Sequence, residues 1–195
     1  MKVLLACLAI PVLLLAGCSN PDPSTPDATG THDDSMKEST NASDPVASAM
    51  SAAPDSVSKA ATILTMDDKG AMKTLRKGTN GWTCMPDTPS TPGPDPMCLD
   101  ENGLAFVMSV FGKTDPPKGK MGFGYMLMGG SDADNDDPYA TAPPKGKEWF
   151  NTGPHVMVFN IGTSFAGYPT TADNPKAPYV MWPDTPYAHL MLPVE

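Results

Sequence analysis

The sequence has no apolar run long enough to cross a membrane, because the run from Val3 to Ala16 is shorter than the roughly 20 residues that a span needs. Basic residues are also scarce: 13 Lys and Arg stand against 22 Asp and Glu, with a formal charge of -9. This balance argues against a nucleic-acid-binding protein. The sequence also contains no CxxC motif, no Gly-rich phosphate loop and no dinucleotide fingerprint, so it gives no sign of a nucleotide site.

The N-terminus is organised as an export signal. Lys2 precedes the apolar run, and the small residues Ala16 and Gly17 lead into Cys18. A charged start, a short apolar centre and a small-residue exit are typical of a secretory signal peptide. We therefore expect residues 1–17 to be removed on export.

The end of this segment, Leu15-Ala16-Gly17-Cys18, resembles the lipobox of bacterial lipoproteins. The resemblance implies that Cys18 carries palmitate-type acyl chains and becomes the first residue of the mature protein, anchored to the membrane. Two or more acyl chains anchor a protein stably. Ser19 stands where that family usually places Asp for inner-membrane retention, so the resemblance favours the outer membrane, facing the periplasm.

Export has a consequence for the remaining cysteines. Cys7 lies in the signal and Cys18 in the lipobox, which leaves Cys84 and Cys98 as a pair in an oxidising compartment. We expect a disulfide that closes the proline-rich loop between them. A thiolate metal site is the alternative, although the sequence offers no second pair of cysteines to complete it.

The chain divides by composition into a tether and a domain. Residues 18–58 are rich in Ser, Thr, Asp, Pro and Ala, and such a stretch buries too little apolar surface to order itself. Residues 59–195 suffice for a single globular domain. Its short apolar runs, separated by Gly and Pro, predict an α+β fold: a small antiparallel sheet, one or two short helices and long ordered loops.

Particular segments carry this prediction. Residues 61–78 read as a β-hairpin with its turn at residues 67–70, and residues 101–112 read as a short helix, for which a strand is almost as good an interpretation. Residues 120–128 alternate as a strand, with Met121, Phe123, Tyr125 and Leu127 on one face. Three further apolar runs, HVMVFNI, PYVMW and AHLMLPV, also predict strands.

In its short motifs GWTCMPD, DPMC, GPHVM and TPYAHLM, the sequence resembles a family of secreted bacterial proteins without assigned activity. The resemblance covers most of residues 80–195. It implies a single domain and no particular chemistry.

The sharpest local pattern is a histidine with a methionine two residues later. His155 precedes Met157 in this way and His189 precedes Met191, while Met126 and Met128 form a third pair of the same spacing. On a strand such residues share a face, and imidazole with thioether suits Cu(I). Packing is the competing interpretation, because 11 of the 14 methionines fall in the folded part and methionine fills cores readily.

An acidic run places carboxylates at Asp132, Asp134 and Asp136, which matches the first ligand positions of a calcium loop. Asp137 and Pro143 occupy positions that an EF-hand gives to Gly and Glu, so only a weak cation loop or a solvated turn remains.

A hydrolase is the last alternative. Residues 162–166 approach a nucleophile elbow at Ser164, with Asp173 or Asp184 and then His189 following in hydrolase order. The elbow needs a strand-to-helix turn on a parallel sheet, for which this domain has little room. We therefore expect a lipid-anchored envelope protein that acts by binding a ligand or another envelope protein rather than by catalysis, with copper, then calcium, as candidate cofactors.

Overall fold

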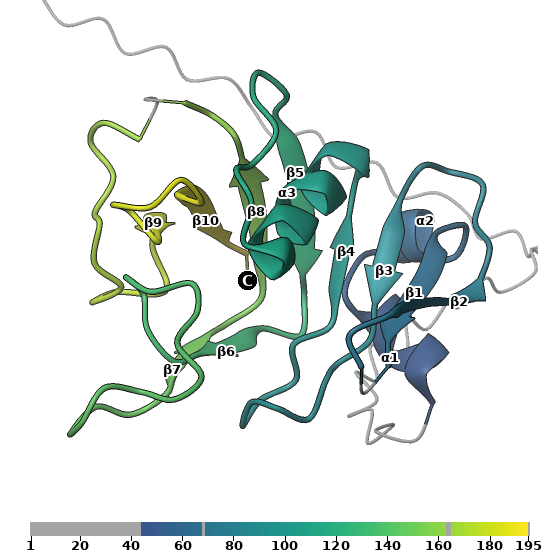
Figure 1. The fold of residues 1–195 in the computed structure, drawn as a ribbon, viewed down its shortest axis with the longest axis horizontal. Coiled ribbons are helices and arrows are strands. Elements are labelled where there is room, and N and C mark those ends of the chain that lie inside the picture. The colour runs from purple at the N-terminus through teal and green to yellow at the C-terminus, as the bar shows by residue number, and fades with distance from the viewer. Residues whose placement is uncertain (1–43, 68, 163–164, 195) are drawn as a thin grey trace, which may run out of the picture. The chain divides into compact units, whose positions relative to one another are not determined.

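The computed structural model describes residues 44–67, 69–162 and 165–194. These residues form a mixed eight-stranded sheet, a separate two-stranded sheet and short helices, so the α+β prediction is confirmed (Figure 1). In chain order the elements are α1 (Pro45–Ser51), α2 (Asp55–Ser58), β1 (Thr62–Met66), β2 (Met72–Arg76), β3 (Thr83–Met85), β4 (Met97–Leu99), α3 (Glu101–Gly112), β5 (Gly122–Met126), β6 (Gly130–Asp132), β7 (Phe150–Thr152), β8 (His155–Phe159), β9 (Tyr179–Met181) and β10 (His189–Pro193).

The order of strands in the large sheet is β2-β1-β3-β4-β5-β8-β10-β9. β1 and β3 run parallel, and the other neighbours pair antiparallel. The sheet therefore differs from the purely antiparallel one expected from the sequence at a single junction, where the chain returns from the β1–β2 hairpin to the other side of β1. β6 and β7 form the small sheet.

The predicted hairpin is present as β1 and β2. The Asp67 carboxylate accepts hydrogen bonds from the backbone N–H groups of Lys69 and Ala71, at 2.9 and 2.8 Å. Gly70 follows with a φ of 79°, in the left-handed region that glycine adopts without strain. This turn chemistry explains why the chain reverses there.

The predicted helix is also present, as α3. Asp100 caps its N-terminus by accepting a hydrogen bond from the N–H of Gly103 at 2.6 Å. The same carboxylate oxygen accepts the N–H of Phe123 at 3.1 Å, which ties the start of the helix to β5. α3 lies across β4, β5 and β8 (Figure 1).

Two glycines allow α3 to approach the sheet closely. A Cβ at Gly122 of β5 would lie 2.4 Å from the backbone nitrogen of Gly103, and a Cβ at Gly103 would lie 2.5 Å from the carbonyl oxygen of Phe123. The alternation predicted for this strand is correct, but the more deeply buried face is the one with Gly122, Gly124 and Met126. Phe123, on the other face, is exposed.

The opposite face of the sheet packs against α1 and α2. Cys84 of β3 and Cys98 of β4 are directly opposed in the ladder and form the predicted disulfide. Both are fully buried, in a cluster with Ala49 and Ala52 from the first helix and its C-cap. The disulfide therefore joins two neighbouring strands under α1.

This packing changes the predicted boundary of the domain. The composition of residues 18–58 predicts a tether that reaches residue 58, because large apolar residues are scarce there. Instead Asp44 caps α1 through the N–H of Val46, and the small alanines fit closely against the disulfide. The folded part thus starts before residue 59, because alanine can bury surface where the neighbouring element approaches closely.

Among the described residues, no helix is both long enough and apolar enough to span a bilayer.

Candidate functional site

The two His-x-Met pairs lie on neighbouring strands, β8 and β10. Met157 lies directly opposite Met191, and His155 lies opposite Pro193. Because the strands are antiparallel, His155 and His189 stand at opposite ends of this pairing with the two methionines between them. All four residues line one cavity between α3 and the sheet.

This cavity, which we call the His–Met cavity, has a volume of about 110 Å³. Its lining comprises Met97, Phe106, Val107, Val110, Phe111, Met126, Asp132, His155, Met157, Phe159, Met181, Trp182, His189 and Met191.

Each histidine also faces a methionine on its other neighbouring strand. Met126 of β5 is opposite His155, and Met181 of β9 is opposite His189. Met126 belonged to the third pair of the sequence pattern, although its partner Met128 is exposed and does not line the cavity. Met181 was not predicted, because its position depends on strand order, which local spacing does not reveal.

Backbone carbonyls fix the tautomer of both histidines. Nδ1 of His155 lies 2.7 Å from the carbonyl oxygen of Gly153, and Nδ1 of His189 lies 3.0 Å from that of Tyr187. A carbonyl only accepts, so each Nδ1 carries the proton and each Nε2 keeps its lone pair. This is the form in which histidine binds a metal.

Burial keeps these imidazoles neutral. It lowers the pKa of His155, against the opposing effect of the Gly153 carbonyl, and it lowers the pKa of His189 to about 4. Each histidine is 2% exposed. Nε2 of His155 is buried without any hydrogen-bond partner, which is costly unless a ligand satisfies it.

Aromatic rings surround His189. The ring centroids of Trp182 and Phe159 lie 5.0 and 5.2 Å from its imidazole, and that of Phe106 lies 5.9 Å away. Trp182 has a φ of 54°, an uncommon value for a bulky residue. Its backbone N–H donates to the backbone carbonyl of Asn135 at 2.8 Å, whereas its indole Nε1 is buried without a hydrogen-bond partner among the described residues. Such strain often marks a functional position.

Asp132, at the end of β6, is the acidic residue of the cavity lining. Burial, and then the charge of Asp95, raise its pKa to about 7. Its carboxylate accepts no hydrogen bond from the described part of the chain. Tyr179, opposite Met191, has a buried hydroxyl without a partner, and its pKa is raised by burial and by Asp132.

The predicted calcium loop does not form a cluster of carboxylates. Asp134 accepts the backbone N–H of Asp136 at 2.9 Å, as in a local turn, whereas Asp132 lines the His–Met cavity. Across residues 44–67, 69–162 and 165–194, no group of three or more His, Cys, Asp or Glu side chains is arranged to hold a metal ion. A site built from methionine thioethers uses ligands outside this set of four residue types.

The hydrolase alternative shares His189 with the His–Met cavity. Ser164 falls outside the described residues. Asp173 accepts a hydrogen bond from the Thr171 hydroxyl at 2.7 Å, and His189 bonds a backbone carbonyl rather than a carboxylate. The described residues therefore supply no carboxylate–histidine pair at His189.

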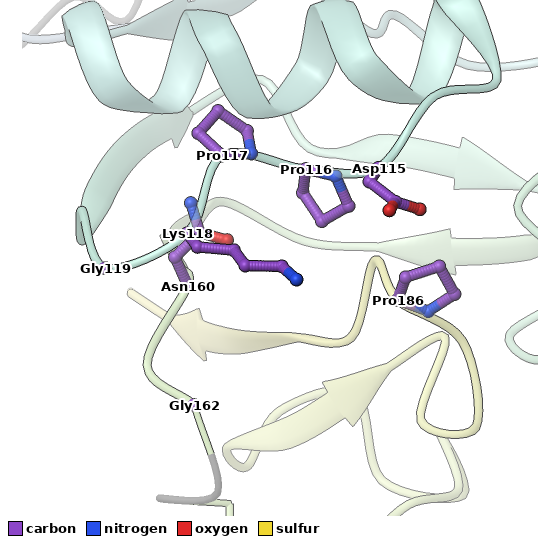
Figure 2. A pocket seen from close by; sticks show the side chains of 8 residues that line it. All are labelled: Asp115, Pro116, Pro117, Lys118, Gly119, Asn160, Gly162 and Pro186. Carbon is purple, nitrogen blue, oxygen red and sulfur yellow. The ribbon is translucent and has the colours of Figure 1, made fainter.

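A larger hollow, of about 400 Å³, opens beside the segment that joins α3 to β5. Figure 2 shows Pro116, Pro117 and Pro186 around it, with the side chains of Asp115 and Lys118 nearby. Asp115 and Lys118 are exposed, and none of the described residues that line the hollow has a buried polar side-chain atom without a hydrogen-bond partner. It resembles a surface depression more than a binding site.

The arrangement in the His–Met cavity is thus a set of neutral thioether and imidazole donors in a partly enclosed, largely apolar space. Comparison with known proteins adds no family to this picture: no family model matches the chain, and neither a curated protein nor a solved structure matches it.

Proposed function

We propose that this protein is a lipid-anchored component of the cell envelope that binds a soft monovalent cation, Cu(I), in the His–Met cavity. It acts by binding rather than by catalysis. The observation that carries the proposal is the buried Nε2 of His155, which has a lone pair, no hydrogen-bond partner and a cavity lined by thioethers in front of it.

The nature of the donors selects the class of ion. Thioether and imidazole ligands suit Cu(I), whereas carboxylate and carbonyl ligands suit calcium, magnesium or manganese. The cavity presents Met126, Met157, Met181 and Met191 together with two neutral imidazoles. A monovalent ion also costs less to desolvate in such a place than a divalent one, since the penalty grows with charge.

The size of the cavity favours an ion over an organic ligand. Pockets for drug-sized molecules usually have volumes of about 300–1,000 Å³. The His–Met cavity measures about 110 Å³, which accommodates an ion or a few waters without rearrangement. We place the ion at the Met157–Met191 pair, with His155 as the third ligand.

The cellular location in this proposal comes from the sequence. The lipobox ending at Cys18 supports acylation, and the Cys84–Cys98 disulfide agrees with an oxidising compartment. The acidic, proline-containing segment after Cys18 would then hold the domain away from the bilayer.

A competition titration tests the binding proposal. The purified protein lacking its signal and lipid, oxidised at the disulfide, is titrated with Cu(I) held by a coloured chelator such as bicinchoninate. We expect one ion per chain, and a weaker complex for His155→Ala. The matched control is Met128→Leu, which removes an exposed thioether near the site and should bind as the parent does. Failure of the parent protein to compete with the chelator would overturn the proposal.

A further inference from the structure

A second hollow adjoins the His–Met cavity on the side of β1, β3 and β4. We call it the outer groove; its volume is about 350 Å³, and Met66, Met85, Met97, Asp95, Asp132 and Phe111 are among the residues that line it. Met97, Phe111 and Asp132 line both hollows. The two spaces therefore meet at these three side chains.

Methionines continue across the sheet from the groove to the buried histidine. Met85 of β3 is opposite Met97 of β4, and Met126 of β5 is opposite His155 of β8. The register between β4 and β5 pairs Cys98 with Tyr125, so its continuation by one residue brings Met97 beside Met126. These four residues form one row across adjacent strands, which lie about 4.8 Å apart.

Exposure is highest at the Met66 end of this path and lowest at His155, while Met97, midway along it, is half-buried. Met66, at the end of β1, is 40% exposed, Met85 is 8% exposed and His155 is 2% exposed. A large exposed thioether at one end and an unpartnered imidazole nitrogen at the other give the row a direction, from solvent to the site.

The charges along the groove favour a cation. Asp95 and Asp132 are the acidic residues in its lining, and burial raises the pKa of both carboxyl groups, that of Asp132 to about 7. Among the described residues that line the groove and the cavity there is no Lys or Arg. The Asp95 carboxylate is partly engaged, since it accepts the N–H of Ser131 at 2.6 Å and the hydroxyl of Thr91. Carboxylates that line a cleft raise the local concentration of cations and their rate of entry.

We propose that the outer groove is the entry route for Cu(I), with Met66 and Met85 as its first binding station and Met97 and Met126 as the next ligands on the way to His155. The inference rests on the proposed function. Each step is a ligand exchange in which a copper–sulfur bond breaks as a bond to the next thioether, or finally to Nε2 of His155, forms, so the copper remains Cu(I) and no electron is transferred.

The test separates the rate of loading from the affinity. Transfer of Cu(I) from the coloured chelator to the protein is followed by stopped-flow absorbance, for the parent, Met66→Leu and the double variant Met66→Leu/Met85→Leu. Leucine keeps the volume and apolar character of methionine and removes the sulfur. We expect loading to slow by about tenfold in the double variant, while the equilibrium affinity stays within about twofold of the parent.

The single variant Met66→Leu should fold as the parent does, because Met66 is exposed. The matched control is Met121→Leu, which removes another exposed methionine that does not line the groove and should load as fast as the parent.

Unchanged loading in the double variant, with affinity retained, would overturn the entry route and leave the binding proposal intact. A loss of affinity equal to the loss of rate would also overturn it, because these residues would then belong to the final site. Absence of binding in the parent would instead remove the proposed function.

Discussion

Met157 of β8 lies directly opposite Met191 of β10, on the face of the sheet that α3 covers. Directly opposed residues in an antiparallel pair have Cβ atoms about 4.5–5.5 Å apart, so two thioethers there can reach a common point. The pair is 6% and 2% exposed, and a histidine stands beyond it at either end. The same face thus holds the soft donors that the sequence distributes over distant segments.

Replacing this pair by leucine should abolish tight Cu(I) binding while the fold is retained. Leucine fills nearly the same volume, so we expect the free energy of unfolding to change by less than about 1.5 kcal/mol for each substitution. Each lost thioether should weaken Cu(I) binding by about tenfold or more, which corresponds to about 1.4 kcal/mol. The chelator competition and chemical denaturation measure the two effects. Met108→Leu/Met121→Leu, at exposed positions, is the control. Binding that survives in the pair variant would exclude these methionines as ligands.

Asp132 should make folding less favourable as the pH rises from about 4 to 7. Its folded pKa of about 7 lies above the ordinary value of 3.8, so the folded state holds a proton that the unfolded state has already released. The contribution of this residue to stability therefore falls with increasing pH, by at most about 1.4 kcal/mol per unit within that window.

Asp132→Asn lacks this dependence. The difference in unfolding free energy between the variant and the parent should grow in favour of the variant from pH 4 to 7 and level off above. His155 and His189 act in the opposite direction, because their lowered pKa values cost stability as the pH falls, but they are common to both proteins and cancel in the difference. Denaturation curves that shift in parallel at every pH would contradict the raised pKa.

Removal of the disulfide by Cys84→Ala/Cys98→Ala should lower the free energy of unfolding by about 3 kcal/mol, the entropic contribution of a loop of this length. The disulfide lies in the cluster with α1, whereas the His–Met cavity lies beneath α3. We therefore expect Cu(I) affinity to change little in the variant at a temperature where it remains folded. Urea denaturation with and without reductant, followed by the titration, checks both statements; a reduced parent should behave like the variant.

Gly124→Ala should destabilise the protein and disturb the site together. An added Cβ would lie 2.8 Å from Cδ2 of Leu99 and 2.8 Å from Cε of Met157, in the packed space under α3. Overpacking of this kind costs about 1–3 kcal/mol, and here it also displaces a proposed ligand.

Gly112→Ala is the matched control for this substitution. Its Cβ would meet only Thr114, at 3.8 Å, and Gly112 has no positive φ. We expect thermal denaturation to show a lowered midpoint for Gly124→Ala and an unchanged midpoint for Gly112→Ala. Equal midpoints would mean that the sheet and Met157 adjust freely.

Acylation at Cys18 is the prediction on which the cellular location rests. In cells fed a labelled fatty acid, the parent protein should carry the label and fractionate with membranes, and Cys18→Ser should lose both properties. Cys7→Ser, which alters the other cysteine of the leader, is the control. An unlabelled parent with an intact leader would contradict the proposed anchor.

The local features of the fold follow from short-range chemistry that the sequence displays. Asp67 and Gly70 make the hairpin turn, Asp100 caps α3, period-two alternation marks β5, and a short apolar run marks β8. The disulfide follows from the small number of cysteines and the expected compartment.

Contacts between segments that are distant in the sequence could not be predicted, because they depend on the order of strands in the sheet. Met126 beside His155 and Met181 beside His189 require β5 and β9 to take particular places in the sheet, which no local pattern specifies. The same holds for α1, whose alanines become buried only because the disulfide lies beneath them. The sequence places Asp132 in a weak cation loop or a solvated turn, whereas its position in the cavity lining depends on the pairing of β6 with β7.

The disulfide also removes both thiols of the described cysteines, so the sulfur atoms that remain there are methionine thioethers. Among the residues that the structure describes, Cys84 and Cys98 are the cysteines, and both are closed off on the far side of the sheet from the His–Met cavity. No thiolate there can capture a copper ion irreversibly or be oxidised by it. The sulfur that faces the cavity is all thioether, which has no proton to release, so an ion bound there would be taken up and given back without deprotonation of its sulfur ligands.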